Sequence, residues 1–177
     1  MLGTLLPLLL LSSCDGNVFG RRLVEPDAAA KVPKIALQTG QELVASCGSS
    51  KGYSYYPEIG MVPEEKSGFS EDAISDGYFY LLKQPDGAYD LVFRDALREQ
   101  RSAVADGAIV QKLRGGPSDA AFMVIYQQGA KATEIYTFYR EAKGKLSFTT
   151  LVSKGSEGPI ARSGILVGAC DHLALDV

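Results

Sequence analysis

Apolar residues recur at every second position along most of the chain, and a period of two is typical of β-strands. The clearest example is the series Tyr78, Tyr80 and Leu82, which shares one face. A Pro-Asp-Gly turn at residues 85–87 separates this series from a second alternating run at residues 89–94. Because proline and glycine favour tight turns, the two runs predict a β-hairpin.

Shorter runs of the same kind predict the remaining strands. They lie at residues 43–47, 109–113, 122–126, 135–139, 146–152 and 165–170. Residues 95–104 predict a turn and a return strand, although they contain several helix-forming side chains. Strands spaced about ten residues apart, with turn signals between them, favour an all-β fold. We therefore expect an antiparallel β-sandwich or barrel of about 7–9 strands.

Residues 48–77 interrupt this pattern, because they hold Gly, Pro, Ser and acidic residues with only short apolar patches. Their composition predicts one long irregular loop, and loops of that length often carry function. The acidic residues are Glu58, Glu64, Glu65, Glu71, Asp72 and Asp76. The spacing of a calcium-binding EF-hand loop is absent, so this segment favours a solvated loop face over a calcium site.

The N-terminus carries an apolar run over residues 5–11. This run is too short to span a bilayer, which needs about 20 apolar residues, but it fits the apolar region of a signal peptide. No Lys or Arg precedes it, unlike in most signal peptides. The sequence Leu11-Ser12-Ser13-Cys14 resembles the lipobox of bacterial lipoproteins. That resemblance implies cleavage before Cys14, acylation of its thiol and attachment to a membrane. The alternatives are an ordinary secretory signal and an untargeted apolar N-terminus.

The chain then divides into three segments. Residues 1–13 form the signal peptide, residues 14–32 a lipid-attached tether, and residues 33–177 the antiparallel β domain. The tether shows no sustained periodicity, with a short helix at residues 26–31 as the alternative. The lipobox resemblance implies a location in the cell envelope, anchored to either membrane and facing the periplasm.

Two cysteines remain once Cys14 is assigned to the lipid. Cys47 and Cys170 each follow an apolar run and are expected at strand ends. An even pair in an oxidising compartment usually forms a disulfide, with a Cα separation within about 7 Å. The alternative is two buried free thiols.

Charge and composition restrict the function. The net charge is −3 and the isoelectric point is near 5.2, whereas a nucleic-acid-binding domain would present a basic patch. The clustered basic residues Arg94, Arg98, Arg101, Lys112 and Arg114 are explained by outward-facing strand positions. His172 is the one histidine, and no cysteines are closely spaced, so no metal or cofactor is indicated.

The segment Gly48-Ser49-Ser50-Lys51-Gly52 matches the G-x-S-x-G pattern of α/β-hydrolases. In those enzymes the serine occupies a turn between a strand and a helix. Here a β-prone, tyrosine-rich segment follows instead of a helix. A serine hydrolase using Ser50 is therefore kept as the alternative function, not the leading one.

An interaction surface is predicted at four aromatic residues of the 48–77 segment, namely Tyr53, Tyr55, Tyr56 and Phe69. Tyrosine suits binding surfaces because it offers an apolar ring and a hydroxyl at little entropic cost. The alternative is that these rings cover one end of the barrel.

The stretches at residues 51–56, 67–69 and 134–138 resemble uncharacterised β-rich envelope proteins of proteobacteria. The Ser-Gly-x-x-Tyr signature of small lipoprotein lysozyme inhibitors is not met, because Glu71 stands at the tyrosine position. The leading interpretation is a non-catalytic, membrane-anchored envelope lipoprotein. We expect it to serve as a binding or assembly-accessory module for an envelope protein or a small ligand.

Overall fold

The computed structural model describes residues 32–94, 98–129, 131–158 and 160–175. The strands over these residues are β1 (Glu42–Tyr56), β2 (Gly68–Ile74), β3 (Phe79–Lys83), β4 (Tyr89–Arg94), β5 (Gln100–Ser102), β6 (Ala108–Gly115), β7 (Asp119–Tyr126), β8 (Ala132–Arg140), β9 (Leu146–Lys154) and β10 (Arg162–Leu173). Two short 3-10 helices, η1 (Glu64–Lys66) and η2 (Ala142–Gly144), lie in the connections. No α-helix occurs in this described part of the chain.

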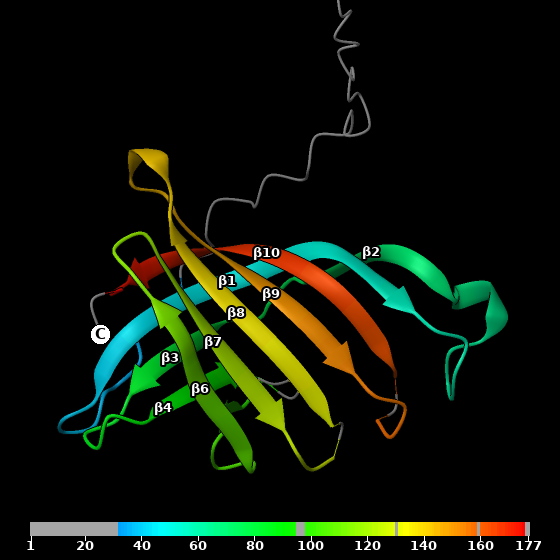
Figure 1. Cartoon of the computed structure of the whole chain (residues 1–177), viewed down its shortest axis with the longest axis horizontal. Helices are drawn as coiled ribbons and strands as arrows, with labels where there is room; N and C mark the ends of the chain where they lie inside the picture. The colour runs from blue at the N-terminus through cyan, green and yellow to red at the C-terminus, as the bar shows by residue number, and fades with distance from the viewer. Residues whose placement is uncertain (1–31, 95–97, 130, 159, 176–177) are drawn as a thin grey trace, which may run out of the picture.

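All ten strands belong to one antiparallel sheet. Nine of them follow the order β5-β4-β3-β1-β10-β9-β8-β7-β6, and β2 pairs with the second half of β1. The sheet curls on itself, so that β6 to β9 lie in front of β3 and β4 in Figure 1 and β4 comes into contact with β6. The result is a half-barrel, which confirms the predicted all-β antiparallel class.

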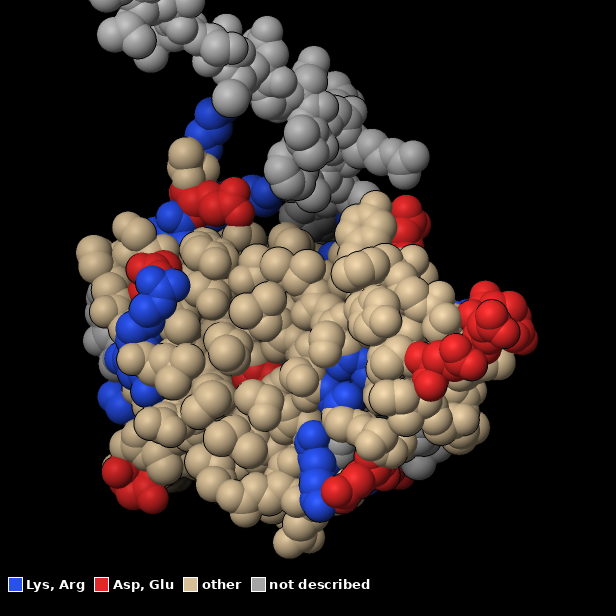
Figure 2. All heavy atoms as spheres, turned by 45° about the vertical axis from the view of Figure 1, so that its right-hand side comes forward, with Lys and Arg blue, Asp and Glu red and all other residues tan. Residues whose placement is uncertain are grey.

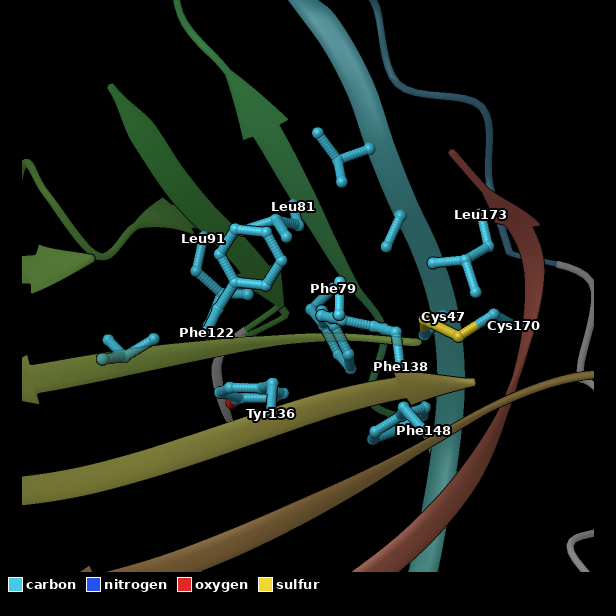
Figure 3. Packing of buried hydrophobic residues seen from close by; sticks show 14 of the residues in the cluster. Cys47, Phe79, Leu81, Leu91, Phe122, Tyr136, Phe138, Phe148, Cys170 and Leu173 are labelled. Carbon is cyan, nitrogen blue, oxygen red and sulfur yellow. A yellow bond between two sulfur atoms is a disulfide. The ribbon is translucent and has the colours of Figure 1, made fainter. Parts of the chain in front are cut away.

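The concave face of the curled sheet encloses the main core. Period-two alternation turns Phe138 of β8 and Phe148 of β9 inward, where both are buried. Phe79 of β3 meets them from the opposite side, with its ring centroid 4.9 Å from that of Phe148 (Figure 3). Burial of an aromatic side chain of this size stabilises a fold by about 1.5–3 kcal/mol. The rings therefore hold the two sides of the half-barrel together.

A disulfide joins β1 to β10 where both strands bend. Cys47 lies opposite Cys170, and Ser50 lies opposite Gly168, so β1 has one more residue than β10 over this interval. An extra residue of this kind bends a strand and increases its twist. Cys47 and Cys170 are bonded, with their Cα atoms 3.9 Å apart (Figure 3). The predicted pairing and the predicted Cα limit are confirmed.

Glycines let β1 and β10 approach closely beside this bend. A Cβ atom on Gly52 would lie 2.0 Å from the carbonyl oxygen of Ile165. A Cβ atom on Gly168 would lie 2.4 Å from the Phe148 ring. Neither position has room for a side chain. The last glycine of the G-x-S-x-G match is thus explained by strand packing.

A second, smaller cluster lies on the outer side of β3. Tyr80 and Leu82 are buried there against Val32. The Tyr80 hydroxyl donates a hydrogen bond to the Pro33 carbonyl oxygen at 2.6 Å. Val32, a residue that we expected at the end of the tether, is therefore packed against the sheet.

The predicted loop at residues 48–77 is wrong in extent. β1 continues to Tyr56, and β2 returns beside it from Gly68 to Ile74. The irregular connection that separates them is confined to residues 57–67. β2 is exposed along nearly its whole length, so it lacks the apolar alternation that marks the other strands. The additional strand brings the total to ten instead of the expected seven to nine.

Candidate functional site

A cavity of about 410 Å³ lies inside the half-barrel. Six aromatic residues line it, namely Tyr78, Phe79, Phe93, Tyr126, Tyr136 and Phe148. Ser50 of β1 and Thr150 of β9 also face it, and their small side chains leave the space open. Cavities of this size, with apolar walls and a few polar groups, are typical of sites for small molecules.

A buried tyrosine and a carboxylate form one polar group in the cavity wall. The Tyr136 hydroxyl donates a hydrogen bond to Glu134 Oε2 at 2.7 Å. Burial raises the pKa of Tyr136 well above its usual value, and the neighbouring Glu134 carboxylate raises it further. Burial and Glu134 also raise the pKa of Tyr126. Both phenols are protonated at neutral pH, as ordinary tyrosines are; the Tyr136 proton is donated to Glu134, and the Tyr126 hydroxyl can donate a hydrogen bond.

An ion pair links β2 to a residue of the cavity wall. Arg162, the first residue of β10, donates to Asp72 Oδ2, and both side chains are largely buried. The same Asp72 oxygen accepts a hydrogen bond from the Ser54 hydroxyl at 2.7 Å. These contacts tie β2 to β1 and β10, so the ion pair fixes the position of Arg162 in the wall.

Two further cations line the cavity. The Arg94 guanidinium lies 5.6 Å from the centre of the Tyr78 ring, within the range of a cation–π contact. Lys154, the last residue of β9, lies directly opposite Arg162. Among the described residues, no carboxylate lies within ion-pair distance of Arg94 or Lys154. By alternation Arg94 shares the side of β4 that carries Val92 of the outer cluster, which agrees with the outward-facing position expected from the sequence.

The sequence did not identify Glu134 as a cavity residue, although its position in the strand pattern indicates that it faces inward. It falls at an inward position of β8, between buried Ala132 and buried Tyr136. A carboxylate on an apolar strand face needs a hydrogen-bond partner. This signal becomes informative only when the concave side of the sheet is known.

Ser50 and His172 do not form a catalytic pair in the structure. Ser50 lies within β1, on a strand and not on a strand-to-helix turn. His172 is opposite Ser46, four residues or about 13 Å of strand away from Ser50. Its Nε2 lies 3.0 Å from the Leu43 carbonyl oxygen. Only Ser50 of the two reaches the cavity.

The four predicted interaction residues divide between the two faces of the β1–β2 ribbon. Tyr53 and Tyr55 are exposed on the outer face, and Phe69 is 82% exposed there. The Tyr55 and Phe69 rings lie 5.1 Å apart between centroids. Tyr56 is half-buried, and as the next residue along the strand it points to the opposite face. These rings therefore do not cap the main core.

The outer aromatic residues continue into an apolar row across the sheet. Tyr53 lies opposite Ile165 of β10, and Ile165 lies opposite Leu151 of β9. All three are exposed. Figure 2, with the right-hand side of Figure 1 brought forward, shows a largely uncharged surface that has a small acidic patch and a few basic side chains near its middle.

Other predicted features are separate from the cavity or lie outside the described residues. Cys14 and the lipobox belong to residues 1–31, which the structure does not describe. No helix within the described ranges is long and apolar enough to cross a bilayer. Those ranges also bring no three His, Cys, Asp or Glu side chains together in a metal-like cluster.

No family model matches the chain, and searches among curated proteins and solved structures gave no match either. The function of the protein is therefore inferred from the site itself.

Proposed function

We propose that the protein is a non-catalytic binding module of the bacterial envelope, and that its ligand occupies the cavity of the half-barrel. The observation that carries this proposal is the ring-lined cavity of about 410 Å³ with hydrogen-bonding groups in its wall. Side chains from β1, β8 and β9 converge on it from a rigid sheet. A site built on strands is positioned more firmly than one built on loops.

A matched pair of substitutions tests this site. Thr150 faces the cavity, and its neighbour Thr149 lies on the outer face of β9. Phenylnaphthylamine, a neutral fluorescent probe, should brighten on binding to the wild type. Thr150→Phe places a ring in the cavity and should abolish the signal, whereas Thr149→Phe should leave it unchanged. Equal binding by both variants would refute the cavity as the site.

The anchoring part of the proposal depends on the lipobox at residues 11–14. An acylated Cys14 would hold the domain at a membrane through the intervening tether. Labelled palmitate should enter the wild-type chain in a bacterial host and should not enter Cys14→Ser. Equal labelling of the two proteins would contradict lipid attachment.

A second candidate function is binding of a protein partner to the exposed row on the outer face. The 82% exposure of Phe69 and its contact with Tyr55 favour it. Solvent-exposed rings contribute little to folding, so Tyr55→Ala with Phe69→Ala should lower the free energy of unfolding by less than about 1.5 kcal/mol. A loss of several kcal/mol would instead give these rings a structural role.

A further inference from the structure

The rim of the cavity carries two directly opposed cations. Lys154 ends β9 and Arg162 begins β10, and the two residues are register partners in the antiparallel ladder. Both side chains line the cavity, so they project to the same face of the sheet. Directly opposed residues have Cβ atoms about 4.5–5.5 Å apart, and like charges in this arrangement repel each other.

The neighbouring carboxylates compensate only part of this charge. Asp72 pairs with Arg162 and is held in place by the Ser54 hydroxyl. Asp106, which also lines the cavity, pairs with Arg101 at 2.6 Å. Glu134 accepts the Tyr136 hydrogen bond and keeps its negative charge, and it forms no ion pair with Lys154. Within the described part of the chain, Lys154 has no carboxylate at ion-pair distance.

The cationic rim lies at one end of a hydrophobic lining. β8 begins and β9 ends at this rim, and Ala132 lies opposite Lys154 there. Phe79 and Phe148 line the cavity as well, and both belong to the buried core. Arg94, the last residue of β4, borders the cavity, with its guanidinium over the Tyr78 ring. One side of the cavity therefore suits an anion, and another suits an apolar or aromatic group.

We infer that the ligand is amphipathic, with an anionic group held between Lys154 and Arg162 and an apolar or aromatic body against the ring lining. This inference rests on the proposed function of the cavity. An anion at this position relieves the repulsion between the two cations and accepts charge-assisted hydrogen bonds from both. The carboxylate, sulfonate and phosphate groups share this chemistry.

Two related probes test the inference with the full chain carrying Cys14→Ser, so that no acyl group competes. Anilinonaphthalene sulfonate and phenylnaphthylamine share one ring system, and only the first carries a charge. The wild-type cavity should bind the sulfonate at least about tenfold more tightly than the neutral probe. This preference should shrink as salt is added, because exposed charges are screened.

Lys154→Gln is the decisive variant, because Lys154 has no structural ion pair whose loss would disturb the fold. It should weaken sulfonate binding at least about fivefold and leave phenylnaphthylamine binding unchanged. Lys66→Gln, in η1 and outside the cavity, is the matched charge control and should change neither affinity. Arg162 is less suitable for substitution, because its removal also leaves Asp72 without its ion-pair partner.

Each outcome is distinct. Equal affinity for the two probes, or sulfonate binding that survives Lys154→Gln, would overturn the anionic ligand while leaving the cavity as a binding site. Binding of neither probe would overturn the cavity as a site and the anionic ligand with it.

Discussion

At the scale of single residues, Asp72 connects three strands. It belongs to β2, accepts a hydrogen bond from Ser54 of β1 and pairs with Arg162 of β10. Asp72 is largely buried and needs its partners, because an unpaired buried charge is costly. The ion pair thus contributes to the shape of the cavity and to the attachment of β2.

Removing one partner of this ion pair should lower the free energy of unfolding more than removing both partners. Arg162→Met leaves Asp72 with only the Ser54 hydroxyl, and we expect it to lower the free energy of unfolding by about 2–4 kcal/mol. Adding Asp72→Leu to that variant should recover part of the loss. Urea denaturation measures both values, and an unchanged midpoint in Arg162→Met would show that the pair is not stabilising.

Tyr80 should make the protein sensitive to alkali. Burial raises its pKa to about 12, with further contributions from Tyr78 and Asp171. The unfolded chain releases this proton near pH 10, so the folded state holds the proton more tightly. The stabilising contribution is complete below pH 10 and is lost as the pH rises through about 12.

Tyr80→Phe should therefore flatten the fall in stability between about pH 10 and 12, because the variant has no phenol to titrate at this position. Below about pH 9 the curves of variant and wild type should run parallel. Free energies of unfolding measured across this range give the comparison. Identical alkaline slopes in the two proteins would rule out the assignment to Tyr80.

The sequence predicted the disulfide residues but not the residues that line the cavity. Cys47 and Cys170 can be paired by counting cysteines and assigning them to strand ends. Alternation places Glu134 and Tyr136 on one strand face, but it does not say that this face becomes concave. Curvature depends on bulges such as the one between Cys47 and Ser50, which are not visible as a pattern of apolar residues.

At the scale of elements, the close approach of β1 and β10 governs the bend of the sheet. Gly52 and Gly168 both lie on this pair of strands and have no room for a Cβ atom. The same pair carries the disulfide and the bulge. The β1–β10 pair therefore lies at the bend between the two halves of the sheet.

Gly52→Ala should disrupt the packing of β1 against β10. Its Cβ atom would lie 2.0 Å from the Ile165 carbonyl oxygen, and backbone atoms cannot move aside without separating the strands. We expect a loss of about 3 kcal/mol or more. Gly155→Ala is the matched control, because its nearest contact would be 3.8 Å away, and it should cost less than about 1 kcal/mol. Similar urea midpoints for the two variants would contradict the steric account.

The β1–β2 ribbon shows why one element was not predicted. Its outer face carries exposed rings such as Phe69. Every residue of β2 is exposed except Gly68 and Asp72, which are partly buried. A strand without a buried face has the composition of a loop, so period-two analysis cannot detect it. The pairing of β2 with β1 is instead visible only in the register of the two strands.

At the scale of the whole molecule, a single sheet forms both the core and the cavity. The rings around Phe79 fill one part of the half-barrel, and the space beside Ser50 and Thr150 stays open. The prediction of a sandwich or barrel gave the right class because alternating strands joined by short turns form antiparallel sheets, although β2 was missed. The cavity could not be predicted from the sequence, because its position depends on which edge strands of the sheet approach each other.

The disulfide should stabilise the whole domain because it closes a loop of 123 positions. In the chain-entropy model a loop of this length contributes about 4–5 kcal/mol, and measured losses on removal are about 2–5 kcal/mol. Reductant should therefore lower the urea midpoint of the wild type. The variant with both Cys47→Ala and Cys170→Ala should not respond to reductant. A wild-type urea midpoint that does not change with reductant would show that the disulfide does not stabilise the domain.

The central claim is that the cavity is the ligand site, and NMR measures its location directly. Backbone amide chemical shifts of the full chain carrying Cys14→Ser should be recorded with and without phenylnaphthylamine. The claim predicts that the largest changes lie at cavity residues Ser50, Glu134 and Thr150. Changes confined to the outer residues Tyr53 and Phe69, or no changes at all, would contradict it.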